Sequence, residues 1–194
     1  MENILEIRER IYNYFHGNTA CQKFFFAVAQ EERYAAYYTS MYLLQDTTES
    51  LSIHRAKGFS NDSHLAYIEF WGVMQAIFIQ QDAICELYWA VTGSELTVDN
   101  LGSWQKLRLL RNTCAGHPAK RKRPKPLTRA FMGRNFGDYS SFTYEKWEKA
   151  GQSKSPLDNI SHPQVKLGSL IDAYAKEAAE TLQKILRHME KEWP

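Results

Sequence analysis

The 194-residue sequence contains no run of 18 apolar residues, and its first residues lack the basic start and apolar stretch of a signal peptide. Both absences predict a chain without a transmembrane helix or a secretory leader. The three cysteines, Cys21, Cys85 and Cys114, lie far apart and form no Cys-x-x-Cys pair. Such thiols are typical of a reducing compartment, so we expect a cytoplasmic protein with no membrane partner.

Clusters of metal ligands are also missing. The six histidines are scattered along the chain, with none of the spacings typical of a zinc site. We therefore expect no metal and no cofactor. Cys114 has no second histidine in an obvious register with it, and we interpret it as a small packing residue rather than a nucleophile.

Acidic residues are absent from one long stretch, Asn100 to Gly137. The same stretch holds ten basic residues: Lys106, Arg108, Arg111, Lys120, Arg121, Lys122, Arg123, Lys125, Arg129 and Arg134. The whole chain has a net charge of only +2, so the remainder carries 14 basic against 22 acidic residues, a net charge of −8. One concentrated positive region in an otherwise acidic chain predicts binding to a polyanion.

Apolar spacing of three and four residues predicts a mostly helical, single domain over residues 1–194. Helices are expected over about 4–15, about 20–57, about 64–92, 103 to about 114, and from a Ser161-x-x-Gln164 capping box to about Met189. The second of these is long, and a break near Asp46–Thr48 is an alternative. The aromatic residues Trp71, Phe78 and Trp89 of the third helix are expected in the core.

Helical spacing is lost from about 119 to 161, which predicts an insertion before the last helix. Residues 131–147 are rich in aromatic residues, serine and threonine and form a candidate β-hairpin. The predicted fold class is therefore all-α, a helical bundle with an irregular basic loop and a possible β-hairpin inserted before its last helix.

The segment Arg111-Asn112-Thr113-Cys114-Ala115-Gly116-His117 joins the end of one predicted helix to the start of a new segment. Arg-Asn, four intervening residues and His resembles the motif of the HEPN (higher eukaryotes and prokaryotes nucleotide-binding) family. Gly116-His117-Pro118 is a frequent form of the end of that motif, and a long helix followed by a short one precedes it here as in the family. The resemblance covers about residues 64–118, together with the last helix by architecture.

This resemblance implies a metal-independent endoribonuclease that cleaves single-stranded RNA as a homodimer, with Arg111, Asn112 and His117 as catalytic residues. Many relatives are growth-arresting toxins or antiviral effectors, so an antitoxin or another regulatory protein is an implied partner. In one branch of toxins a modified tyrosine follows two residues after the histidine. Here Ala119 stands at that place, so the chain departs from that branch.

The three residues suit this chemistry on their own terms. RNA supplies its own nucleophile, the 2′-OH, and needs a proton carrier and a cation at the phosphate. The ordinary pKa of histidine is about 6.5, so His117 can exchange protons near neutral pH. Arg111 can contact two phosphate oxygens at once, and Asn112 can orient the phosphate. The predicted RNA-binding residues are those of the basic loop: Lys120, Arg121, Lys122, Arg123 and Lys125.

Other interpretations stay open at this point. Arg111 can simply cap the end of a helix, and the basic loop can be only a solvated segment. Asp82 and Glu86 either face solvent or support Arg111 or His117 from one turn of the preceding helix. Two further functions are compatible with the sequence, a non-catalytic HEPN-like module that binds nucleotide, RNA or a partner protein, and a helical dimerisation protein whose motif is structural.

Overall fold

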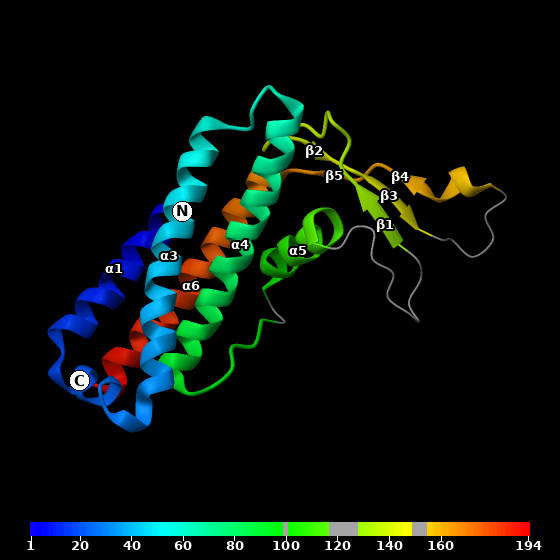
Figure 1. Ribbon diagram of the computed structural model, residues 1–194. Coiled ribbons are helices and arrows are strands. Elements are labelled where there is room, and N and C mark those ends of the chain that lie inside the picture. Colours follow the sequence, from blue (N-terminus) through cyan, green and yellow to red (C-terminus); the bar gives the residue numbers. More distant parts are fainter. Residues whose placement is uncertain (99–100, 117–127, 149–154) are drawn as a thin grey trace.

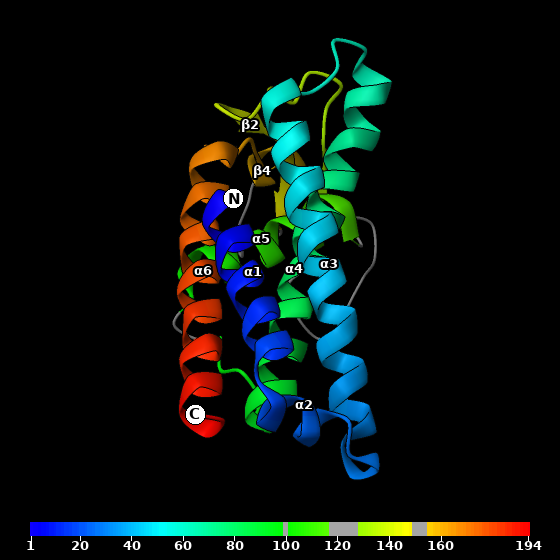
Figure 2. The same ribbon diagram turned by 90° about the vertical axis from the view of Figure 1, so that its left-hand side faces the viewer.

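The computed structural model describes residues 1–98, 101–116, 128–148 and 155–194. Within these ranges the chain is mainly helical, with a small antiparallel sheet region. The α-helices are α1 (Glu2–Gly17), α2 (Thr19–Phe25), α3 (Glu31–Lys57), α4 (Ser63–Thr92), α5 (Gly102–Arg111) and α6 (Leu167–Glu192). The long helices α1, α3, α4 and α6 run side by side, and α5 lies across one side of this bundle (Figures 1 and 2).

The prediction for α4 is confirmed, and local residues determine where this helix begins and ends. The Asp62 carboxylate accepts hydrogen bonds from the backbone N–H groups of His64 and Leu65, which caps the start of the helix. Gly93 ends the helix in the left-handed conformation at φ 73°, which a glycine adopts without strain.

The predicted helix over about 20–57 is interrupted, but not near Asp46–Thr48, where a break was considered as an alternative. The interruption lies at Phe26–Gln30, which contains the short 3-10 helix η1 (Val28–Gln30) between α2 and α3. At that alternative position, the Thr48 hydroxyl donates to the Leu44 carbonyl at 2.6 Å inside a continuous α3. Its oxygen also accepts a 2.7 Å hydrogen bond from Gln80 Nε2 on α4. Thr48 therefore makes a polar contact between two helices instead of breaking its own helix.

That contact belongs to a fully buried polar chain in the middle of the bundle. The Tyr174 hydroxyl on α6 donates to Gln80 Oε1 at 2.9 Å, and Gln80 Nε2 donates onward to Thr48. The surrounding core is apolar and includes Leu44, Ile84 and Leu182 at zero exposure. Because each polar atom in this chain has a partner, burying it does not carry the cost of an unsatisfied group.

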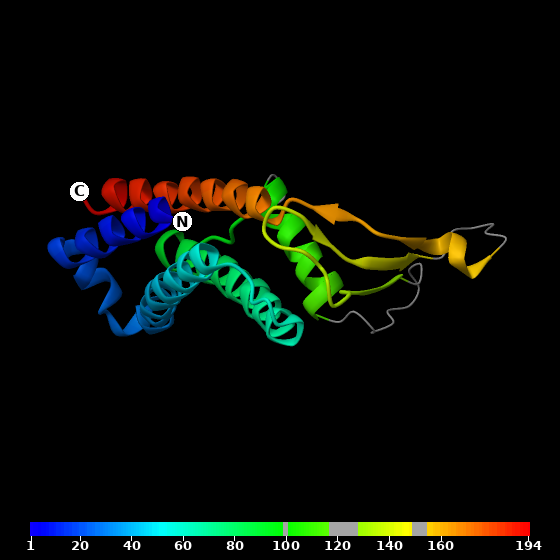
Figure 3. The same ribbon diagram turned by 90° about the horizontal axis from the view of Figure 1, so that it is seen from above.

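The insertion before α6 contains two small antiparallel sheets, which agrees with the β-structure expected there. One sheet has the order β1 (Thr128–Phe131), β3 (Glu145–Glu148) and β4 (Ile160–Ser161). The other pairs β2 (Phe142–Thr143) with β5 (Gln164–Val165), and a 3-10 helix η3 (Pro156–Asn159) precedes β4. Seen from above, this insertion extends away from the bundle beyond α5 (Figure 3).

The predicted start of the last helix is therefore wrong. Ser161 and Gln164 lie in β4 and β5 rather than in a capping box, and α6 begins only at Leu167. Pairing with β3 and β2 supplies backbone hydrogen bonds that a helix would have provided. The Gly168 N–H at the start of α6 donates to the Tyr139 carbonyl at 2.6 Å, which ties this helix to the insertion.

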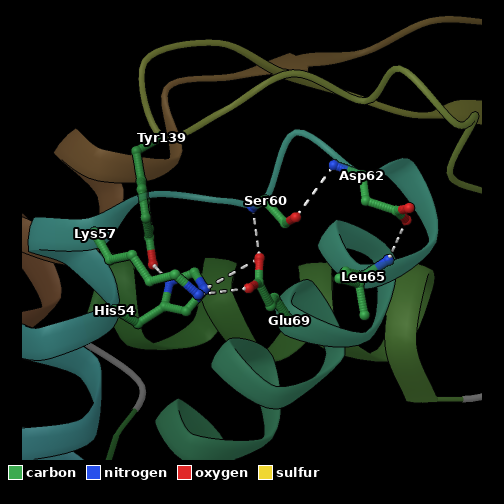
Figure 4. A network of polar contacts seen from close by, with 7 residues as sticks. All are labelled: His54, Lys57, Ser60, Asp62, Leu65, Glu69 and Tyr139. Atoms are coloured by element: carbon green, nitrogen blue, oxygen red, sulfur yellow. Dashed lines mark hydrogen bonds and ion pairs between the residues drawn. The ribbon is translucent and has the colours of Figure 1, made fainter.

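A tight turn holds the insertion against the bundle through Tyr139. The turn depends on Gly137, which has φ 94° and lies so close to the Ser141 carbonyl that a Cβ would stand 1.9 Å from its oxygen. The Tyr139 ring stacks on Phe59 at 4.8 Å, and its hydroxyl lies 2.7 Å from His54 Nδ1 (Figure 4). Burial raises the pKa of Tyr139 to about 12, so this hydroxyl stays protonated at neutral pH.

In the described parts of the chain, no helix combines the length and the apolar character needed to cross a bilayer.

Candidate functional site

The sequence motif begins at the C-terminal end of α5, where the helix widens into a single π-type segment, η2 (Asn112–Gly116). Trp104, Leu107 and Leu110 bury one side of α5, and the adjoining face carries Arg108 and Arg111, one turn apart. Both arginines point to α4. This packing places the Arg111 guanidinium at the rim of the bundle, partly exposed to solvent.

Arg108 and Arg111 share one aromatic partner, Phe78 of α4. The guanidinium carbon of each arginine lies 4.5 Å from the centre of this ring. A ring face attracts a nearby cation, so Phe78 holds both side chains in place without neutralising their positive charges. Phe78 was expected in the core, but it lies half-buried at the surface of the bundle, where these two arginines cover its ring.

The two arginines differ in their remaining partners. Arg108 forms an ion pair with the Asp82 carboxylate. Arg111 donates instead to two neutral amide oxygens, Gln75 Oε1 at 3.1 Å and Asn112 Oδ1 at 3.2 Å. Among the residues that the structure describes, no carboxylate lies within ion-pair distance of Arg111. Its positive charge is thus positioned by neighbours that do not neutralise it.

Gly116 closes over Arg111 at the end of the π-type segment. A Cβ at this position would lie 2.9 Å from Arg111 Nη1 and 3.4 Å from Asn112 Oδ1. The absence of a side chain at 116 therefore lets the backbone approach the guanidinium and the amide together.

Of the predicted catalytic residues, the structure describes Arg111 and Asn112, whose side chains are hydrogen-bonded to each other. His117 and the basic residues Lys120, Arg121, Lys122, Arg123 and Lys125 lie outside the described residues. Asp82, predicted as possible support for Arg111 or His117, forms its ion pair with Arg108. Glu86 is exposed and lines, with Asp82, Trp89 and residues of α3, a cleft of about 490 Å³.

Cys114 is 2 % exposed, and burial raises the pKa of its thiol to about 12. A thiol with that pKa is not a thiolate near neutral pH, which agrees with a packing role inside the motif.

The sequence analysis missed Gln75, Phe78 and Arg108. A signal for them exists in the spacing: Gln75, Phe78 and Asp82 follow one another at steps of three and four residues on α4. Arg108 and Arg111 are spaced three apart on α5, so one helical face meets the other. The pattern on α4 was hidden by the apolar residues around it, which are typical of a helix buried on more than one side.

An exposed apolar face of α4 leads along the helix toward this cluster. Leu65 is 56 % exposed, Ile68 64 % and Trp71 45 %, and Gln75 follows one turn after Trp71. Trp71 was expected in the core, and its exposure corrects that prediction. Large apolar side chains gathered on one helix face are typical of a surface that contacts another protein.

Comparison of the chain with models of protein families, with curated protein sequences and with solved structures finds no match.

Proposed function

We propose that this chain is a metal-independent endoribonuclease of the HEPN type that cleaves single-stranded RNA in the cytoplasm. The observation that carries the proposal is the state of Arg111. Its guanidinium is fixed by Phe78, Gln75 and Asn112, yet no described carboxylate neutralises it. A positioned, unpaired guanidinium is suited to bind a phosphate and to stabilise charge that develops on it.

In the proposed reaction the 2′-OH of RNA attacks the adjacent phosphorus, and the bond from phosphorus to the 5′-oxygen of the next nucleotide breaks. His117 carries a proton in this step, from the attacking hydroxyl or to the leaving oxygen. Arg111 binds the non-bridging oxygens, and Asn112 orients both Arg111 and the phosphate. The products are a 2′,3′-cyclic phosphate and a 5′-hydroxyl, and the basic loop at 120–125 binds the RNA backbone.

The proposed assembly is a homodimer that joins two copies of the motif. One arginine and one histidine are few groups for acid–base catalysis, and a two-fold axis near the motif doubles them. The exposed face of Leu65, Ile68 and Trp71 is the surface we assign to this contact, since it leads to Gln75 and hence to Arg111. Ile68→Glu should convert the dimer to a monomer in light scattering and lower cleavage with it.

As for many HEPN proteins, the proposed role is a toxin or an antiviral effector, with an antitoxin or other regulatory protein as a partner. The experiment that tests the activity is incubation of the purified chain with single-stranded RNA in EDTA, with analysis of the new ends. We expect a 2′,3′-cyclic phosphate, no cleavage of the matching DNA, and at least about 10²-fold slower cleavage by His117→Ala.

Undiminished cleavage by His117→Ala, or an absolute requirement for Mg²⁺, would contradict the proposal. A folded wild-type chain that binds RNA but cleaves none would instead favour the non-catalytic binding module.

A further inference from the structure

A groove of about 450 Å³ separates α5 from the insertion. It is bounded by three segments that are distant in sequence: the outer face of α5, the strand β3 with the residue before it, and the start of α6 with β5. Figures 1 and 3 both show α5 beside these strands. The lining residues are Lys106, Leu109, Leu110, Thr113, Tyr144, Lys146, Glu148, Val165 and Leu170.

The two long walls present complementary side chains to the same space. Along β3, alternation places Tyr144, Lys146 and Glu148 on the face toward α5. Along α5, steps of three and four residues place Lys106 and Leu109 on the facing side, and Thr113 follows within the motif itself. Arg108 and Arg111 leave the same helix on its other side, toward Phe78.

Charge in the groove is concentrated on the α5 wall. Lys146 donates to Glu148 at 2.7 Å, so this pair on β3 is close to neutral. Lys106 is exposed, and no carboxylate lies within ion-pair distance of it among the described residues. The stretch from Asn100 to Gly137 adds no acidic residue near it in sequence. Because Lys146 is paired with Glu148, Lys106 is the lysine of this lining that has no carboxylate partner among the described residues, and beside apolar side chains it favours an anionic ligand with an apolar, flat part.

The apolar part of the groove has room for a ring. Leu109 is 67 % exposed although its neighbours Leu107 and Leu110 are buried, so it offers free apolar surface. Tyr144 is half-buried opposite, with its ring stacked on Phe142 at 6.0 Å. A base of single-stranded nucleic acid can stack on such a tyrosine while a lysine contacts its phosphate.

We infer that this groove binds one nucleotide of single-stranded RNA, with the base between Leu109 and Tyr144 and the phosphate at Lys106. The inference rests on the proposed function, because RNA is the proposed substrate. Thr113 connects the two sites: it lines the groove and lies two residues after Arg111. RNA that passes around the end of α5 contacts Arg111 on one side of the helix and the groove on the other. The groove thus positions a nucleotide that flanks the cleaved bond.

The test uses a short, labelled 2′-O-methyl RNA, which is not cleaved because it has no free 2′-OH. Its affinity for the full chain is measured by fluorescence anisotropy at several salt concentrations. Lys106→Glu should weaken binding roughly tenfold and lower the salt slope by about 0.7, the value for one lost phosphate contact on a single strand. Tyr144→Leu, which keeps the groove apolar, should weaken it at least about fivefold through lost stacking.

The matched control is Lys184→Glu, which makes the same change of charge at an exposed position on α6 and should bind like the wild type. A 4-thiouridine in the oligonucleotide should crosslink to peptides that contain Leu109 or Tyr144. Wild-type affinity in Lys106→Glu, crosslinks only to other segments, or equal competition by polyglutamate would overturn the inference.

These outcomes separate the groove from the proposed activity. If the uncleavable RNA binds through Lys106 and Tyr144 while ordinary RNA is never cut, the groove is supported and the nuclease proposal fails. If RNA is cut but binding does not depend on the groove, the nuclease proposal is supported and the groove inference fails.

Discussion

Two polar clusters of this molecule differ in whether their charged side chains have partners of opposite charge. At the α3–α4 connection, the Glu69 carboxylate accepts a bond from the Ser60 N–H at 2.7 Å and from Lys57 Nζ at 3.2 Å, and His54 Nε2 lies 3.7 Å away (Figure 4). At the end of α5, Arg111 has only an aromatic ring and two amide oxygens. The first cluster has anion and cation together, whereas the described part of the second leaves a cation without an anion.

We interpret the first cluster as a stabilising network and the second as part of the proposed RNA site. In the first cluster Ser60 and Lys57 donate to the Glu69 carboxylate, and His54 Nδ1 contacts the Tyr139 hydroxyl, which connects the insertion to the bundle. In the second, Arg108 forms an ion pair with Asp82, whereas Arg111, one turn later, forms no ion pair with a described carboxylate. Arg108 therefore serves as an internal comparison for Arg111, because both lie on the same ring and the same helix.

The largest expected effect comes from replacing each of the two arginines by alanine. Arg111→Ala should lower RNA cleavage in EDTA by about 10²–10³-fold, as expected when one group that stabilises developing charge is lost. Arg108→Ala should lower it far less, since Asp82 already engages that guanidinium. Initial rates check this, with Arg187→Ala on the exposed face of α6 as the control for the loss of one arginine. Equal losses in Arg108→Ala and Arg111→Ala would contradict the distinction.

A smaller loss is expected when the position of Arg111 changes but its charge stays. The Cβ in Gly116→Ala would meet Arg111 Nη1 at 2.9 Å, and a flexible side chain moves away readily. We expect cleavage to fall by roughly 10- to 100-fold, because small misplacements of catalytic groups are costly. The melting temperature should stay close to that of the wild type. A large loss of stability with unchanged specific activity would show that Gly116 serves the fold alone.

In the cluster around Glu69 and His54 we expect the opposite result, a loss of stability with little effect on RNA cleavage. Tyr139→Phe removes the hydroxyl that lies 2.7 Å from His54 Nδ1 but keeps the ring on Phe59. The free energy of unfolding should fall by about 1 kcal/mol, the typical value for one hydrogen bond. Urea denaturation measures it, and RNA cleavage at a temperature well below the melting point should be unchanged. A loss of cleavage in a stably folded Tyr139→Phe protein would join the two clusters functionally.

The smallest effect concerns pH. The Ser60 N–H first, and then Lys57 and His54, hold the pKa of Glu69 below its ordinary value of 4.5. A depressed carboxylate pKa contributes stability that is present above the unfolded pKa and is lost as pH falls through the folded pKa. Glu69→Gln should therefore lose some stability at pH 7 and flatten the decline below about pH 4.5. Thermal melts across this range check it. A decline as steep as in the wild type would assign acid sensitivity to other carboxylates.

Much of the bundle could be predicted from the sequence because the relevant signals are local. Asp62 and Gly93 mark the two ends of α4 by side-chain capping and by a left-handed glycine, which need no tertiary context. The failures involve distant contacts. The strands that replace the expected capping box at Ser161 depend on pairing with β3, which is distant in the sequence.

The same distinction applies to the candidate site. Arg111 and Asn112 were found from a short motif, because they are adjacent in the chain. Gln75 and Phe78 were not found, because their contact with Arg111 spans more than thirty residues of sequence. Trp71 was assigned to the core since an apolar residue on an apolar helix gives no sign of which side faces solvent.

The most direct test of the central claim supplies Arg111 with the anion that it lacks. Gln75→Glu places a carboxylate where the amide oxygen now accepts a 3.1 Å bond from Arg111, with almost no change in shape. We expect a folded protein, at least as stable as the wild type, whose RNA cleavage is lowered by about fivefold or more. That factor corresponds to the roughly 1 kcal/mol of an exposed ion pair that phosphate must displace. Wild-type cleavage by a folded Gln75→Glu protein would contradict the claim that an unneutralised Arg111 serves the reaction.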